Sequence, residues 1–278
     1  MKKTILAAAL AAAALAAPAA TPSETAALAA AKQFYAAKSG DFAAAWKALP
    51  ASYQKDVADV VKLFASKIDA DLWTAAQGAL KDVAGVALKK AEFALADVDE
   101  ADRPDVIRMI AKAAAVFKAA SYDDIKAGNL AKVLAAKPLE MAGVTDKLPA
   151  FKMPEISVKQ NDDGTVAVTV DDETENFSLV EGKWIPKEIA DGFADGIKEA
   201  KEGLADFSVP AQMKPQIMAI FPAISSAAKN CAKAQTKEQF DQAAMMGFMP
   251  VMMMAGSLGG ANAGEDDDEE EEEYDIAE

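Results

Sequence analysis

Six methionines stand in one short stretch near the C-terminus, MMGFMPVMMM, at residues 245–254. Thioether sulfur binds soft ions such as Cu(I), and Met245, Met249 and Met252 share one face of a helix. The stretch lacks the histidine, cysteine and acidic residues that usually accompany copper, and it is too short to span a bilayer. Because methionine is flexible and fills irregular gaps, the favoured interpretation is a terminal helix packed into the core.

A second interpretation places the same residues on the surface. Met249, Met252 and Met253 would then form an adaptable hydrophobic surface for a protein partner. The two interpretations differ in one observable, because burial of these side chains supports the core and exposure supports the partner surface.

The chain contains no histidine. This absence removes Ser-His-Asp and Cys-His catalysis, the usual zinc sites and the side chain best suited to proton transfer near neutral pH. No glycine-rich phosphate loop is present either. Paired carboxylates remain open to a histidine-free hydrolase, but the acids fall mainly on polar helix faces and in turns. We therefore predict no enzyme, no cofactor and no catalytic or metal-binding residue.

An acidic loop and a single cysteine are two further candidates for chemistry. Asp97, Asp99 and Asp102 lie in one loop, and alternate aspartates can bind calcium, but Ala101 occupies a position that would need an oxygen ligand. A solvated turn is predicted there. Cys231 follows Ile224 by seven residues on one helical stripe, so a buried thiol is predicted.

Helical periodicity dominates residues 21–150. Thr21 and Glu24 have the spacing of a capping box, and Asp69 or Asp71 can begin a later helix. One apolar stripe at intervals of three and four comprises Val57, Val60, Val61, Phe64 and Ile68. On the following helix the residues expected to face inward are Leu72, Trp73, Ala76, Leu80, Val83 and Ala87.

The apolar period changes to two between residues 155 and 186. Val166, Val168 and Val170 alternate with other residues after the turn sequence NDDG, and Glu181-Gly182 supplies another turn. Helical periodicity returns over residues 187–256. These patterns predict an α+β fold, predominantly helical, with a small antiparallel meander of three to four strands packed on helices. We expect residues 20–258 to form one domain.

The N-terminus resembles a secretory signal peptide. Two lysines precede an apolar, alanine-rich segment, and Ala17, Pro18 and Ala19 provide small residues for a signal peptidase. We predict a signal peptide at residues 1–19, cleavage near Ala19, and a periplasmic or secreted product. The segment is shorter than a membrane-spanning helix requires, so no stable membrane insertion is expected after cleavage.

The C-terminal sequence is a run of like charges. Eleven carboxylates lie between Glu265 and Glu278, and they account for most of the net charge of -15. Residues 259–278 are predicted to be a disordered acidic tail that aids solubility, with docking of basic partners or weak calcium binding as alternatives. Nucleic acid is not an expected partner, because the two arginines, Arg103 and Arg108, and the dispersed lysines form no basic stripe.

Two segments carry a resemblance to known families. The segment that begins AAKQFYAAKSGDFAAAW and continues through LPASYQKDV resembles part of a group of uncharacterised exported bacterial proteins. The later segment FSLVEGKWIP is similar to the closing strands of exported proteins of the nuclear-transport-factor-two-like superfamily. That resemblance implies a curved sheet packed on N-terminal helices. The superfamily includes binding, structural and catalytic members, and long helical segments before and after the strands depart from it. Asp41, Trp46 and Trp184 match as capping and core residues.

Three functional hypotheses follow. The favoured one is a non-catalytic binding or structural protein of the periplasm, with a concave apolar surface formed by the sheet and the helices. A chaperone-like or metal-buffering envelope factor would use the acidic tail and the methionine-rich helix. A histidine-free periplasmic hydrolase would require two opposed carboxylates in a pocket.

Overall fold

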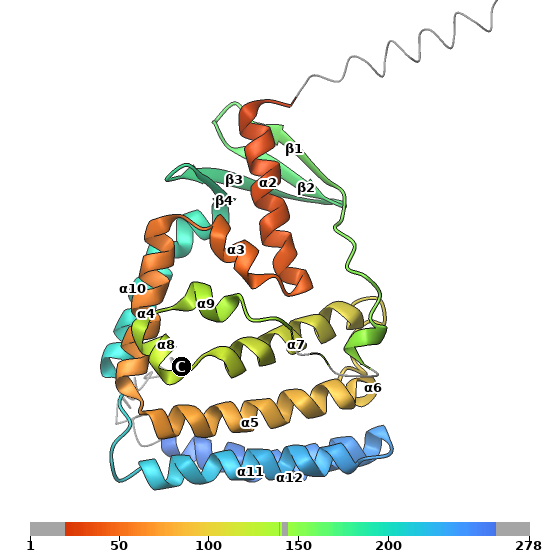
Figure 1. Cartoon of the computed structure of the whole chain (residues 1–278), viewed down its shortest axis with the longest axis vertical. Coiled ribbons are helices and arrows are strands. Elements are labelled where there is room, and N and C mark those ends of the chain that lie inside the picture. Colours follow the sequence, from red (N-terminus) through yellow and green to blue (C-terminus); the bar gives the residue numbers. More distant parts are fainter. Residues whose placement is uncertain (1–19, 139, 141–143, 260–278) are drawn as a thin grey trace, which may run out of the picture.

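The computed structural model describes residues 20–138, 140 and 144–259 (Figure 1). The helices are α2 (Pro22–Ala36), α3 (Phe42–Ala48), α4 (Ala51–Lys67), α5 (Ala70–Lys89), α6 (Ala91–Ala94), α7 (Arg103–Ala119), α8 (Tyr122–Ala127), α9 (Leu130–Leu134), α10 (Lys187–Asp206), α11 (Lys214–Lys233) and α12 (Lys237–Gly259). The strands are β1 (Ile156–Gln160), β2 (Val166–Val170), β3 (Glu173–Val180) and β4 (Lys183–Pro186). The predicted α+β class, mostly helical with a small sheet, is confirmed.

The sheet is an antiparallel meander with the strand order β1-β2-β3-β4. The alternation of the sequence places Val166, Val168 and Val170 of β2 on one face, where they are buried. Glu181 and Gly182 both have positive φ in the two-residue turn between β3 and β4. Two such residues match the right-handed twist of a tight hairpin.

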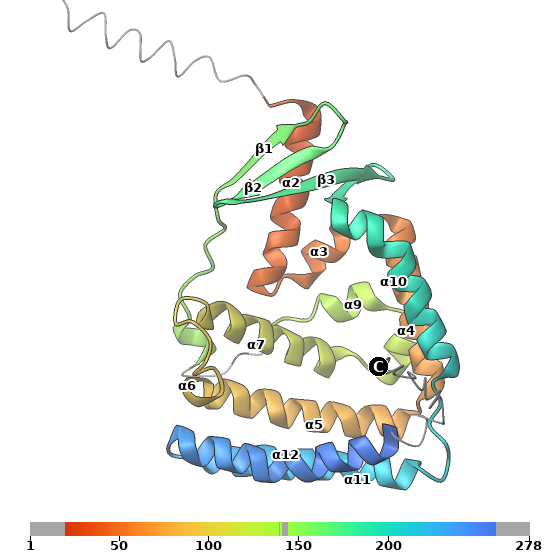
Figure 2. The same ribbon diagram turned by 180° about the vertical axis from the view of Figure 1, so that it is seen from behind.

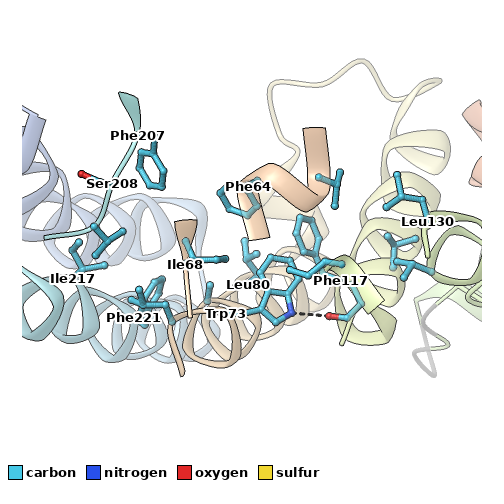
Figure 3. A pocket seen from close by; sticks show the side chains of 18 of the residues that line it. Phe64, Ile68, Trp73, Leu80, Phe117, Leu130, Phe207, Ser208, Ile217 and Phe221 are labelled. Carbon is cyan, nitrogen blue, oxygen red and sulfur yellow. Dashed lines mark hydrogen bonds between the residues drawn. The ribbon is translucent and has the colours of Figure 1, made fainter. Parts of the chain in front are cut away.

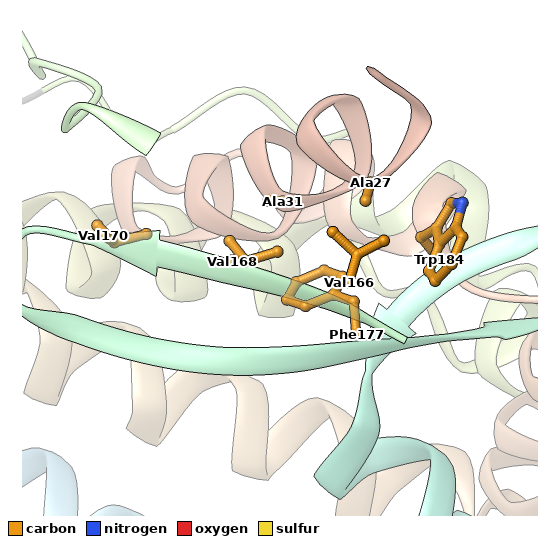
Figure 4. Packing of buried hydrophobic residues seen from close by; sticks show 7 residues of the cluster. All are labelled: Ala27, Ala31, Val166, Val168, Val170, Phe177 and Trp184. Atoms are coloured by element: carbon orange, nitrogen blue, oxygen red, sulfur yellow. The ribbon is translucent and has the colours of Figure 1, made fainter. Parts of the chain in front are cut away.

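Helix α2 covers the apolar face of this sheet. Its Ala27 and Ala31 are fully buried against Phe177 of β3, Trp184 of β4 and the valines of β2 (Figure 4). Small side chains on the helix allow close approach to the larger residues of the strands. The predicted capping box is present, because the Thr21 hydroxyl accepts a hydrogen bond from the Glu24 N–H and the Glu24 carboxylate accepts one from the Thr21 N–H.

A layered group of helices lies beyond the sheet (Figure 2). Helix α5 contacts α7 on one side and α11 on the other, and α12 packs along α11. Helices α4 and α10 run side by side between the sheet and these layers, and the rings of Tyr53 and Phe193 stack there with their centroids 3.6 Å apart. Helix α11 contains Pro222 and continues through it from Lys214 to Lys233.

Two predicted segments lie outside the described residues. They are the signal peptide, residues 1–19, and the acidic tail, residues 259–278, apart from Gly259, at which α12 ends. Among the helices that are described, none is both long and apolar enough to cross a membrane.

Candidate functional site

An open groove with a volume of about 920 Å³ lies among the helices (Figure 3). We call it the apolar groove. Its walls come from α4, α5, the C-terminal end of α7, helices α8 and α9, the segment between α10 and α11, and the first turns of α11. Its lining residues include Val61, Phe64, Ile68, Leu72, Trp73, Ala76, Leu80, Val116, Phe117, Ile125, Leu130, Val133, Phe207, Ser208, Val209, Pro210, Met213, Ile217 and Phe221.

The junction between α4 and α5 explains why these apolar faces meet. Ile68 is extended and ends α4, and the Asp69 carboxylate accepts a hydrogen bond from the Leu72 N–H, which caps α5. The chain therefore turns immediately after the predicted stripe of α4. Phe64 and Ile68 then face the same groove as Leu72 and the residues that follow it on α5.

Polar atoms beneath the groove are hydrogen-bonded within the protein. The Trp73 Nε1–H and the Gln77 amide both donate to the carbonyl oxygen of Ala120, at 2.7 Å and 2.8 Å. The Tyr122 hydroxyl donates to the carbonyl oxygen of Ile68 at 2.9 Å. Ser208 supplies the one side-chain hydroxyl among the lining residues. A bound molecule would therefore meet hydrocarbon and aromatic surface along most of the groove.

The connecting segment, residues 207–213, forms one wall and is fastened at both ends by lysines. Before it, Lys67 Nζ donates to the carbonyl oxygen of Ala205 at 2.8 Å. After it, Lys214 Nζ lies 2.5 Å from Asp69 Oδ2 and 3.8 Å from Asp71 Oδ2. The Lys214 hydrogen bond, together with the Leu72 N–H, lowers the pKa of Asp69. The same carboxylate thus caps α5 and fixes the connecting segment.

Asp124 organises the α8–α9 side of the groove. Its carboxylate accepts hydrogen bonds from Lys132 at 2.9 Å, from the Ser121 hydroxyl at 2.8 Å and from the Asn129 amide at 3.2 Å. These contacts, with Lys132 the strongest, lower the pKa of Asp124 to about 2. The turn that they stabilise carries Ile125 and Val133 into the groove wall.

Met245, Met246, Met249, Met252 and Met253 lie on the surface, which corrects the favoured interpretation. Met249, Met252 and Met253 are 50 %, 72 % and 71 % exposed. Helix α12 does pack against the body, and its closest approach is at Gly247, where a Cβ would stand 2.6 Å from the Ala227 Cβ. The methionines were expected to fill the core, but the close contact between α12 and α11 is made by Gly247 and Ala227 instead. Their exposure is the observation that the partner-surface interpretation requires.

The two remaining candidates are Cys231 and the acidic loop at Asp97, Asp99 and Asp102. Cys231 is buried in α11 as predicted, and burial raises the pKa of its thiol. Asp99 and Asp102 form a backbone turn through the Asp102 N–H and the Asp99 carbonyl oxygen, 2.9 Å apart. Within the described ranges, no three side chains of His, Cys, Asp or Glu type are grouped so as to hold a metal ion.

The sequence predicts the apolar helix faces that line the groove, but it does not predict the groove itself. Leu80 was predicted to face inward, but it is 42 % exposed at the rim. The concave apolar surface was expected beside the sheet, where α2 fills the space, and it lies among the helices instead. The large exposed side chains Phe117 and Phe207 also belong to the rim. The turn at Ile68 and Asp69 is the sequence signal that could have indicated convergence of the two stripes.

Comparison of the chain with protein-family models, curated protein sequences and solved structures found no match. The site is therefore described by its geometry alone, as an apolar groove among helices.

Proposed function

We propose that the protein is an exported, non-catalytic binding protein that holds a long hydrocarbon chain, such as the acyl chain of a lipid, in the apolar groove. The observation that carries the proposal is the lining of a groove of about 920 Å³ by apolar side chains. Ligand sites are typically concave, mostly apolar and of this size. The polar atoms beneath the groove already have hydrogen-bond partners within the protein. A ligand therefore needs few hydrogen-bonding groups to bind there.

Exposed apolar surface supports binding over a purely structural role. Leu80, Phe117 and Phe207 are 42 %, 40 % and 40 % exposed at the rim, although burial of apolar surface is favourable. A hydrocarbon chain in the groove would cover this surface. The lining contains no carboxylate, which supports a binding protein over a histidine-free hydrolase.

Export is part of the same proposal and rests on the signal-like residues 1–19. A periplasmic protein that shields a hydrocarbon chain from water would suit carriage of lipids across an aqueous compartment. We propose no nucleic-acid partner.

Binding of N-phenyl-1-naphthylamine, a dye that fluoresces in apolar surroundings, tests the proposal. The mature chain should bind the dye saturably, and palmitate should displace it far more effectively than octanoate, because each buried methylene contributes about 0.8 kcal/mol. The variant Ala76→Trp, which fills the groove, should lose most of this binding. Ala29→Trp, on the exposed face of α2, is the matched control and should bind normally. Equal dye binding by the two variants, or none by the wild type, would refute the proposal.

A further inference from the structure

Helix α12 has two faces with different surroundings. Phe240 and Gly247 lie on the face toward the body, where the Phe240 ring is 6.2 Å from that of Phe93 and Gly247 meets Ala227. At 100° per residue, Met245, Met249 and Met252 lie on the opposite side of the helix. The packing of α12 therefore does not use these three methionines.

The opposite side of α12 carries a shallow hollow of about 450 Å³. Its lining consists of Met245, Met249, Met252, Met253 and Phe248. We call the first three residues the methionine triad. Met249 is four residues after Met245 and three before Met252, so its side chain is a neighbour of both. All three are at least half exposed to solvent.

The chemistry of this hollow selects one class of ligand. Thioether sulfur is uncharged, polarisable and a poor partner for hard cations, whereas Cu(I) and Ag(I) accept soft sulfur ligands. Methionine has three rotatable bonds beyond its Cα, which allows the sulfur atoms of neighbouring turns to converge on one ion. Neither a histidine nor a thiolate is needed to complete a three-sulfur set for a monovalent soft ion.

We propose that the methionine triad binds one monovalent soft metal ion, Cu(I), through the three sulfur atoms of Met245, Met249 and Met252. Binding is simple ligation without oxidation or reduction, and the ion approaches from solvent. Met253 and Phe248 flank the ion and provide its apolar surroundings. This site is separate from the apolar groove, so the two can be tested independently.

Anaerobic competition with bicinchoninate, a coloured Cu(I) chelator, measures the site in the full chain. The wild type should withdraw one equivalent of Cu(I) from the chelator, and the triple variant Met245→Leu/Met249→Leu/Met252→Leu should not. The matched control Met109→Leu/Met153→Leu replaces two other exposed methionines and should bind as the wild type does. Cys231→Ala should also bind normally, because the thiol is buried in α11.

Ag(I), which undergoes no redox change under these conditions, gives an independent readout. In protein labelled with ¹³C at the methionine methyl groups, Ag(I) should shift the NMR signals of the triad and leave those of Met109 and Met153 in place. Failure of the wild type to withdraw Cu(I) would overturn the proposal. Equal binding by the triple variant, or loss of binding in Cys231→Ala, would overturn it as well. Circular dichroism should show unchanged helicity in every variant.

Discussion

The Nε1–H of Trp73 and the amide of Gln77 donate to one acceptor, the carbonyl oxygen of Ala120, across the interface between α5 and the end of α7. This shared acceptor holds the floor of the apolar groove in place. It also keeps the polar edge of the indole satisfied while the rest of the ring faces the groove.

The shared acceptor predicts a non-additive loss of stability. Trp73→Phe and Gln77→Leu each leave one donor on the Ala120 carbonyl oxygen, so the loss at that oxygen should cost less than about 1 kcal/mol in either variant. Gln77→Leu also removes a hydrogen bond to the Phe117 carbonyl oxygen, which the double variant loses equally. The double variant leaves that oxygen without either donor and should cost roughly 1–3 kcal/mol. Urea unfolding of the four proteins measures the coupling. Strict additivity would show that the two hydrogen bonds act independently.

Two glycines in helices should respond oppositely to alanine. Gly203 in α10 has open space around an added Cβ, so Gly203→Ala should stabilise the protein by about 0.5–1 kcal/mol through helix propensity. In Gly247→Ala the added Cβ would stand 2.6 Å from the Ala227 Cβ, so α12 must shift away from α11. Such overpacking costs about 1–3 kcal/mol. Thermal unfolding of both variants provides the comparison, and stabilisation by Gly247→Ala would contradict the close helix contact.

Asp124 should give the protein a specific sensitivity to acid. Lys132, Ser121 and Asn129 lower the pKa of Asp124 to about 2, so this carboxyl group is a stronger acid in the folded protein than in the unfolded chain. Ionised Asp124 therefore stabilises the folded protein. This stabilisation is fully present at a pH above the ordinary pKa of 3.8 and is lost as the pH falls through about 2.

The variant Asp124→Asn tests this assignment by urea unfolding between these two pH values. The difference in stability between the wild type and the variant should shrink steadily as the pH falls. Asp123→Asn, on the neighbouring residue, is the control and should follow the wild type. A difference that is independent of pH would assign the effect to packing rather than to ionisation.

The lysine contacts of the connecting segment should control release of a bound chain. Lys214→Met removes the ion pair with Asp69, which lies 2.5 Å away, and frees the C-terminal end of residues 207–213. Dye dissociation should therefore become faster, while dye association changes less. Lys198→Met, which removes only a pair with Glu202 at 3.9 Å, is the control. Stopped-flow fluorescence measures both rates, and identical rates in the two variants would exclude a role for this contact.

The sequence predicted local structure well where one pattern dominates. The alternation of Val166, Val168 and Val170 predicted the strand and its buried face, and the Thr21–Glu24 spacing predicted the first helix. These features depend on neighbours within a few residues of the chain.

Tertiary arrangement was harder to predict. An apolar stripe indicates that a helix face avoids water, but it does not indicate whether the partner face is close enough to exclude a cavity. Leu80 and Met249 are apolar residues on such stripes, and both are exposed in the folded chain. Their positions depend on α11 and on the segment after α10, more than 100 residues away from Leu80 in the sequence.

Quenching of tryptophan fluorescence by a brominated stearate tests the apolar groove most directly. Bromine quenches at short range, and Trp73 lines the groove. Of the other two tryptophans, Trp184 lies in the core of the sheet and Trp46 lies on α3, outside the groove lining. If a hydrocarbon chain enters the groove, the wild type should show saturable quenching that is largely absent from Trp73→Phe. Quenching that does not saturate, or that is the same in both proteins, would contradict binding of the chain at this site.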